Sequence, residues 1–331
     1  MERNDVIQAI RIGRSQGIVP DLSGADLHGI DLSHTDLRGA NFSGANFSGA
    51  NLTGANLIRA NLHGAILTRA KLADIRWFGA ILDEADLSDI DLQREKMEVV
   101  SLVGANLSGA GLYRTSLRWG KFNQANLTEA NLQEADLSEA QLIEARLDRA
   151  NLNSAILTGA DLSRANLSGA NLRRANLHTS NLSQANLAEA ELKGIKLYGA
   201  NLSQINLSGF DLRGLDLNET NLTGANLSMA NLFRVNLAKA DLTQANLSDA
   251  DLTETNLSRA ILSQANLKDA RATEAQLKLA KKLDEATMPN GEIYVAPEPA
   301  KPKPGGKEKH KATAAGLAAS LARIKKKDDD E

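Results

Sequence analysis

The chain has 331 residues, and its 38 basic and 41 acidic side chains give a formal charge of −3, which by itself implies neither nucleic acid nor an anionic membrane as partner. Only 3% of the residues are aromatic and none is cysteine, which excludes disulfides and thiolate metal sites and leaves burial to many small Leu and Ala contacts. The amino terminus lacks a continuous apolar segment, and no apolar run approaches the roughly 20 residues of a membrane span. We therefore expect a soluble, cytoplasmic protein.

Residues 1–19 are expected to form a capping helix. The segment 4–15 places Asn4 at a favourable N-cap position and Val6, Ile7 and Ile10 on one side of a helix. A cap is needed because the open end of a repeat structure exposes unpaired backbone groups and apolar side chains.

Residues 20–272 repeat every five residues without a change of frame. From Leu22 to Leu277, Leu or Phe occupies every fifth position except Trp77, Met97 and Ala272. A small residue, usually Ala, stands two places before each Leu, and Asn or Asp usually lies between them. An α-helix would rotate successive leucines by about 140°, and a flat strand would send them to alternate faces. Neither element can bury them all.

A backbone that turns a corner every five residues can bury every Leu. Four corners of about 90° close a coil of 20 residues, and successive coils then stack at the inter-strand spacing of about 4.8 Å. The repeat predicts about 13 such coils and a rod roughly 60 Å long, with columns of Leu along its axis. The fold class expected from the period is all-β, a β-solenoid.

These repeats resemble the pentapeptide-repeat family over about three-quarters of the chain. The resemblance is carried by runs such as GANFSGANFSGANLTGANLIRANL (39–62) and ADLSRANLSGANLRRANL (160–177). It implies a right-handed quadrilateral β-helix. The closing stretch LDEATMPNG (283–291) is similar to that of repeat-rich cyanobacterial members. One branch of the family mimics duplex DNA and protects or inhibits DNA gyrase.

The segment 93–100 departs from the repeat. It contains no Ala and would place the Glu95 carboxylate at an inward position, where an unpaired charge is costly. We therefore expect these residues to bulge out as a loop. Arg94, Glu95, Lys96 and Glu98 are then candidate partner contacts, although a tolerated insertion without a role is the simpler interpretation.

A second irregular patch puts bulky residues in one column of the small-residue position, and it predicts a locally wider coil with no function attached. The column holds Ile195, Leu215, Val235 and Thr255.

Residues 273–291 are expected to form a second capping helix. Thr273 to Gln276 has the form of a capping box, and Leu277, Ala280 and Leu283 follow at helical spacing.

Residues 292–331 begin as a Pro- and Lys-rich linker, which is disordered by composition. Within them, Leu317, Leu321 and Ile324 share one face of a short basic amphipathic helix. That helix is a candidate contact for a partner, for another copy of the chain or for a membrane surface. A marginal tail without a role is the alternative.

No catalytic, cofactor-binding or metal-binding residues are predicted. The four histidines of the repeat, His28, His34, His63 and His178, fall at outward positions, and no two are a multiple of 20 residues apart. The abundant Ser and Thr residues lack a paired His, and no phosphate-binding glycine motif is present.

The sequence predicts a non-enzymatic structural or protein-interaction module with an unknown protein partner and a possible homo-oligomer through the rod ends or the tail. The alternative is a DNA-mimicking binder of a type II topoisomerase such as gyrase. Duplex DNA carries about one charge per 1.7 Å, so a 60 Å mimic needs about 35 negative charges. Residues 21–285 contain 32 acids and 26 bases, a net of −6. Two expected cross-coil ion pairs, Glu129 with Arg149 and Glu144 with Arg164, neutralise part of the acidic surface.

Overall fold

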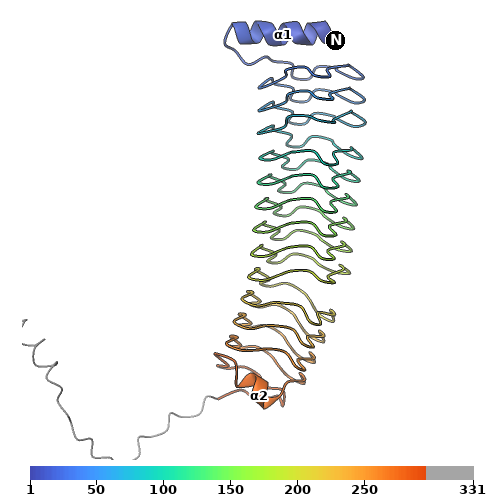
Figure 1. The fold of residues 1–331 in the computed structure, drawn as a ribbon. Helices are drawn as coiled ribbons and strands as arrows, with labels where there is room; N and C mark the ends of the chain where they lie inside the picture. The colour runs from blue at the N-terminus through green and yellow to red at the C-terminus, as the bar shows by residue number, and fades with distance from the viewer. Residues whose placement is uncertain (296–331) are drawn as a thin grey trace, which may run out of the picture. The chain divides into compact units, whose positions relative to one another are not determined.

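The computed structural model describes residues 1–295, which form one stack of coils (Figure 1). Parallel bridges join residues 20 apart, from Asp21 with Asn41 to Asp251 with Arg271. Each side of a coil contributes one bridged residue, so the described chain has no longer strand. We name the four sides a, b, c and d; in one coil their inward leucines are Leu142, Leu147, Leu152 and Leu157.

Every corner of the coil is a tight turn that begins at the inward Leu. In a typical corner the Ala145 amide donates to the Leu142 carbonyl at 3.0 Å, and Glu144 between them has a φ of 59°. A bond between the first and fourth residues with a positive φ at the third is characteristic of a type II turn. The small residue therefore closes each turn beside the Leu, which explains why Ala is preferred there.

Asn and Asp before the Leu hold each corner and connect the coils. The amide of Ser43 donates to Asn41 Oδ1 at 3.2 Å, and Asn61 Nδ2 on the next coil donates to the same oxygen at 3.0 Å. Backbone bonds run beside this side-chain ladder, for example from Phe42 N to Asn61 O at 2.6 Å. An Asn can donate as well as accept, so it continues the ladder from coil to coil.

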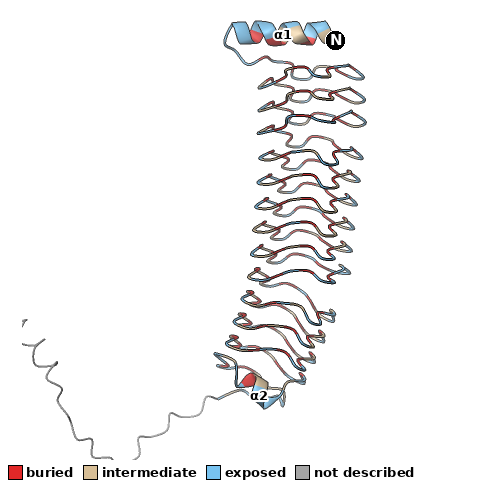
Figure 2. Cartoon of the chain, viewed as in Figure 1, coloured by how far each residue is buried: buried red, intermediate tan, exposed pale blue. Residues whose placement is uncertain are grey.

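The core lies along the axis of the stack (Figure 2). The inward leucines of residues 22–267 are buried, and Trp77 and Met97 take the same place on neighbouring coils with no exposed surface. Each such side chain contributes about 1.5–3 kcal/mol on burial. The rod is thus held by repetition of one small contact set.

Helix α1 (Arg3–Ser15) lies against the first coil. Its N-cap is Glu2 and not Asn4 as predicted, because Asp5 accepts a bond from the Glu2 amide in a capping box. Val6 and Ile10 are buried. Arg3 donates to the Asp31 carbonyl at 2.9 Å, which fixes the helix on the coil end.

Helix α2 (Glu274–Leu277) is far shorter than the helix predicted over 273–291, and that prediction is wrong beyond residue 277. The Thr273 capping box forms, but the chain then returns to the coil. Lys282 and Thr287 bridge residues 21 positions earlier, so α2 adds one residue to the period. The reason is visible in the sequence, because residues 282–286 read K-L-D-E-A and repeat the five-residue pattern.

The loop predicted at 93–100 is not formed. Lys96 bridges Ser116, the Arg94 amide donates to the Tyr113 carbonyl at 2.9 Å, and Met97 is buried. The coil accommodates Glu95 without a bulge because its carboxylate accepts a hydrogen bond from the Asp74 amide at 2.8 Å. This bond replaces the backbone bond that the Asp74 amide would otherwise make to the next coil.

The ladder opens at two places between residues 21 and 271. At the first opening, sides c and d lack the bridges from 71 to 91 and from 76 to 96. At the second opening, sides b, c and d lack the bridges from 186 to 206, from 191 to 211 and from 196 to 216. The wider coil predicted around Leu215 is therefore present only between the coil of Leu215 and the preceding coil. Asp216 still bridges Asn236 on the following coil.

Consecutive bulky residues at the small position coincide with both openings. Ile90 and Glu95 precede the bridges missing at the first, and Ile205, Phe210 and Leu215 precede those missing at the second. A single bulky residue is tolerated, because Asn176 still bridges Lys196 directly after Ile195. Within residues 1–295, no helix is long and apolar enough to cross a membrane.

Candidate functional site

Side d carries a line of exposed apolar side chains. Phe78, Val99 and Trp119 lie on three consecutive coils and are 52%, 43% and 48% exposed. Farther along the same side, Ile156 and Tyr198 are also exposed. We call these five residues the d-face strip.

The repeat directs these side chains outward. Phe78 follows the inward Trp77, while Val99 and Trp119 occupy corners with φ values of 59° and 57°. The inward places are already filled by the core, so a large residue at a corner extends into solvent. Arg118 covers part of the strip, with its guanidinium carbon 4.6 Å from the centroid of a Trp119 ring. The strip therefore combines aromatic surface with positive charge.

The predicted contact residues of 93–100 divide into two groups. Arg94 and Lys96 are exposed, and Glu98 lies beside Val99, where it accepts a bond from Ser116 Oγ at 3.0 Å. Glu95 is half-buried and points between coils, and burial raises its pKa above the usual range although the Asp74 amide favours the charged form. Glu98 thus adjoins the d-face strip, whereas Glu95 has a structural position. Leu317, Leu321 and Ile324 lie outside the described residues.

Acidic corner residues are paired with bases on adjacent coils. The predicted pairs are confirmed, with Arg149 Nη1 at 3.1 Å from Glu129 and Arg164 Nη1 at 3.2 Å from Glu144. Arg114 lies 2.6 Å from Glu134, and this bond holds the pKa of the Glu134 carboxyl below its usual range. These exposed pairs contribute little stability individually. Their consequence is a surface of mixed charge.

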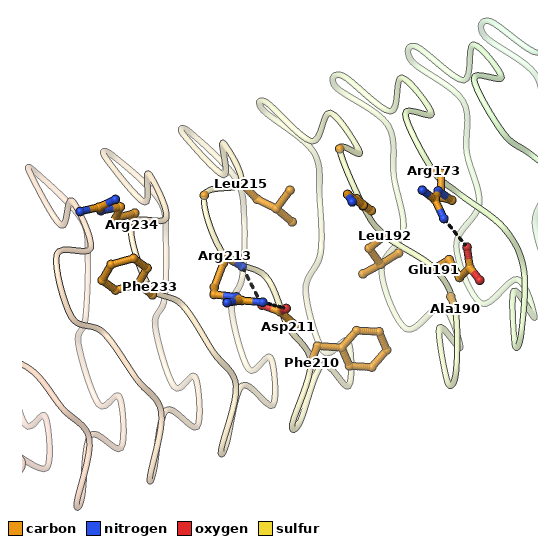
Figure 3. A pocket seen from close by; sticks show the side chains of 13 residues that line it. Arg173, Ala190, Glu191, Leu192, Phe210, Asp211, Arg213, Leu215, Phe233 and Arg234 are labelled. Atoms are coloured by element: carbon orange, nitrogen blue, oxygen red, sulfur yellow. Dashed lines mark hydrogen bonds and ion pairs between the residues drawn. The ribbon is translucent and has the colours of Figure 1, made fainter.

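The second opening contains a cleft of about 750 Å³ on side c (Figure 3). Leu192, Phe210 and Leu215 form its apolar part, and charged side chains surround them. The sequence patterns considered above do not predict this cleft. The available signal was the run of Ile205, Phe210 and Leu215 at three successive small positions.

Asn residues on side b show that the second opening is a physical separation of coils. Asn186 Nδ2 donates to Asn166 at 2.9 Å, and Asn226 Nδ2 donates to Asn206 at 3.1 Å. The intervening pair of Asn186 and Asn206 has suitable residues but no bridge. Side a stays closed, because Asn201 Nδ2 donates to Asn181 at 2.9 Å.

No cluster of three or more His, Asp or Glu side chains in residues 1–295 is arranged to hold a metal ion. The His28 ring lies 2.8 Å from Ser48 Oγ, and the His178 ring packs edge-on against Tyr198.

The model of pentapeptide repeats matches residues 21–74 and 80–269 in overlapping segments. The chain belongs to the pentapeptide-repeat family. Proteins of this family fold as right-handed quadrilateral β-helices, the class to which the 20-residue period corresponds. They are generally structural or interaction modules.

Several solved pentapeptide-repeat structures are similar to this chain. HetL, involved in heterocyst differentiation regulation in the cyanobacterium Nostoc, is 31% identical, with 89% of this chain and 100% of HetL covered and a TM-score of 0.23. Rfr23 from the cyanobacterium Cyanothece is 35% identical over 35% of this chain and 85% of its own, with a TM-score of 0.17. QnrB1, a plasmid-mediated fluoroquinolone resistance protein, is 23% identical over 54% of this chain and 86% of its own, with a TM-score of 0.32. A comparison with curated proteins finds no match.

Proposed function

We propose that this pentapeptide-repeat protein is a non-enzymatic interaction module that binds a protein partner through the d-face strip. The observation that carries the proposal is the alignment of Phe78, Val99 and Trp119 on consecutive coils. Large apolar side chains scattered singly on a surface need no explanation, but a contiguous patch is typical of an interaction site.

The strip has the chemistry of a binding hot spot. Trp and Arg are enriched among the residues that dominate interface energies, and here Arg118 covers Trp119. The coils of Val99 and Trp119 are joined by regular backbone bonds, including Val99 N to Arg118 O at 3.0 Å and Trp119 N to Ser138 O at 3.1 Å. Binding at these two residues would therefore require little ordering of the backbone, which reduces the entropic cost of association. Phe78 lies across the first opening from Val99.

DNA mimicry is not favoured by the surface. A mimic needs a continuous acidic face, whereas Glu129, Glu134 and Glu144 each lie beside an arginine of a neighbouring coil. The relatives' roles in heterocyst regulation and drug resistance belong to those proteins, and their low TM-scores carry no argument for this chain.

The proposal is tested by affinity capture from host lysate with the full chain as bait. A double variant, Phe78→Ser with Trp119→Ser, removes the centre of the strip without touching inward positions. The matched control is Ile66→Ser with Met229→Ser, which removes exposed apolar residues from side b. We expect a partner that is captured by the wild type and the control, and lost at least tenfold with the strip variant.

A chain that ends at residue 295 separates the rod from the tail. A partner retained by the strip variant but lost on this truncation would overturn the proposal and assign recognition to the segment with Leu317, Leu321 and Ile324. Topoisomerase subunits captured equally by the strip variant would support DNA mimicry instead.

A further inference from the structure

The cleft of the second opening exposes backbone groups that are paired elsewhere on side c. In a closed interval, Leu172 N donates to Glu191 O at 3.0 Å and Arg174 N donates to Lys193 O at 3.0 Å. One coil farther on, the equivalent amides of Leu192 and Gly194 have no backbone partner in residues 1–295. Asp211 N also lacks its partner, the Ala190 carbonyl.

These groups form the two facing edges of an interrupted ladder. One edge offers the amides of Leu192 and Gly194 and the carbonyl of Ala190, and the other offers the carbonyls of Asp211 and Arg213. Unpaired donors and acceptors in register are a template for another extended segment. An extended backbone is therefore the ligand geometry that fits the cleft.

The apolar part of the cleft selects the side chains of the ligand. Figure 3 shows Leu192, Phe210 and Leu215 together in the opening. Phe210 and Leu215 are partly exposed although they stand at positions where Ala is otherwise buried. An apolar side chain of the ligand would cover this surface. It would replace the apolar contacts that neighbouring coils make elsewhere but do not make at the opening.

The rim of the cleft selects the charge of the ligand. Four basic residues line it, Arg173, Lys193, Arg213 and Arg234, against two acidic residues, Glu191 and Asp211. Arg213 is held by Asp211 at 2.7 Å, and Arg173 lies 3.6 Å from Glu191. Arg234 stacks on Phe233 and lies 2.7 Å from Glu254 outside the cleft, so the excess positive charge of the rim is that of Lys193. The rim therefore favours an acidic ligand.

We propose that this cleft binds an extended acidic peptide segment of a partner protein by strand addition. The peptide backbone accepts from the amides of Leu192 and Gly194, an apolar side chain lies against Phe210 and Leu215, and flanking carboxylates lie near Lys193. This site is on side c and is separate from the d-face strip, so either can exist without the other.

The test uses the full chain and three labelled eight-residue peptides with fluorescence anisotropy as the readout. The first alternates Glu with Val or Leu, the second replaces every Glu by Lys, and the third is the acidic peptide with alternate amides N-methylated. We expect the acidic peptide to bind at least tenfold more tightly than either of the others. Hydrogen exchange at Leu192 and Gly194 should slow when it binds.

Variants locate the binding. The pair Phe210→Ala with Leu215→Ala restores the usual small residues, and we expect it to close the cleft and reduce affinity at least tenfold. Lys193→Gln should weaken binding several-fold and reduce its dependence on salt. Lys71→Gln, an exposed residue on side c six coils away, is the matched control and should have no effect.

Three results would overturn the proposal. Equal affinity for the acidic and basic peptides would remove the role of the rim, and full affinity of the N-methylated peptide would remove strand addition. Binding that survives Phe210→Ala with Leu215→Ala, in a variant whose hydrogen exchange shows a closed ladder, would place the peptide elsewhere.

Discussion

The two openings of the ladder begin from the same kind of sequence and end differently. At the first, Ile90 and Glu95 stand at small positions, and the Glu95 carboxylate turns into the gap to accept the Asp74 amide at 2.8 Å. At the second, the intruding residues include Phe210 and Leu215, which cannot accept a hydrogen bond. The backbone groups there remain unpaired and a cleft of about 750 Å³ results.

Polarity of the intruding residue thus decides what the opening becomes. A carboxylate repairs part of the lost bonding at the cost of its own desolvation, whereas apolar residues separate the coils and leave the edges open. Side a remains bonded at both openings, because Asn61 bridges Ile81 at the first and Asn181 bridges Asn201 at the second. The rod is therefore continuous at each opening, and the ladder is open on sides c and d at the first and on sides b, c and d at the second.

The largest effect is expected from truncating the core in a closed coil and at the cleft. Leu152→Ala in a closed coil should destabilise the protein by about 2–5 kcal/mol, because the surrounding coils cannot collapse into the cavity. Leu192→Ala should cost about half as much, because its cavity joins an existing cleft. Urea unfolding of both variants measures the difference. Equal costs would mean that the second opening is closed in solution.

The next effect concerns hydrogen exchange at the two edges. The Leu192 and Gly194 amides lack the partners that the equivalent amides of Leu152 and Ser154 have, so they should exchange at least about tenfold faster. Phe210→Ala with Leu215→Ala should slow that exchange. Native-state exchange with mass spectrometry gives both quantities, and equal rates in the wild type would contradict an open ladder.

The Glu95→Gln substitution tests the role of the carboxylate at the first opening through the pH dependence of protein stability. Burial raises the folded-state pKa of Glu95 above the unfolded value, so the charged form is penalised in the folded state. This penalty is absent at acidic pH and develops as pH rises from the unfolded pKa through the folded one. Gln can still accept from the Asp74 amide, so the variant should be more stable than the wild type at neutral pH, by less than about 1 kcal/mol because solvent screens the half-exposed carboxylate.

Thermal melts across pH check the sign of the Glu95 effect. The advantage of Glu95→Gln should disappear below the unfolded pKa of Glu, near pH 4. Glu134→Gln is the control, because Arg114 lowers the pKa of the Glu134 carboxyl, and it should show a pH dependence of the opposite sign. A stability advantage of the variant that grows toward acidic pH would contradict a raised pKa of the half-buried Glu95 carboxyl.

Most of the fold could be predicted from the sequence because a five-residue period has one geometric solution. The inward positions from Leu22 onward follow from the period alone, and they are buried as it requires. Predictions failed where a local signal competed with the repeat. Thr273 begins a helix as its capping box indicates, but the pattern at 282–286 resumes the coil, and Glu95 is tolerated because a backbone amide lies within reach.

The candidate sites were less predictable because they depend on contacts between coils. Phe78, Val99 and Trp119 are separated by about 20 residues and become neighbours only after coiling. The cleft depends on how three bulky residues add, since Ile195 alone leaves the bridge from Asn176 to Lys196 intact. A column-by-column inspection at the 20-residue period would have identified both features.

The smallest effect tests the corner geometry at the first opening. Val99 is a β-branched residue with a φ of 59°, a conformation that such side chains rarely adopt. Val99→Gly should relieve this strain and stabilise the protein by about 0.5–1 kcal/mol, although Gly also increases the freedom of the unfolded chain. Ser154→Gly is the control, because Ser154 is not β-branched and stands at a corner with a φ of 57°; this variant should gain less stability. If Val99→Gly instead lowers the melting temperature, packing of Val99 within the d-face strip outweighs its backbone strain, and the strip contributes to stability as well as to recognition.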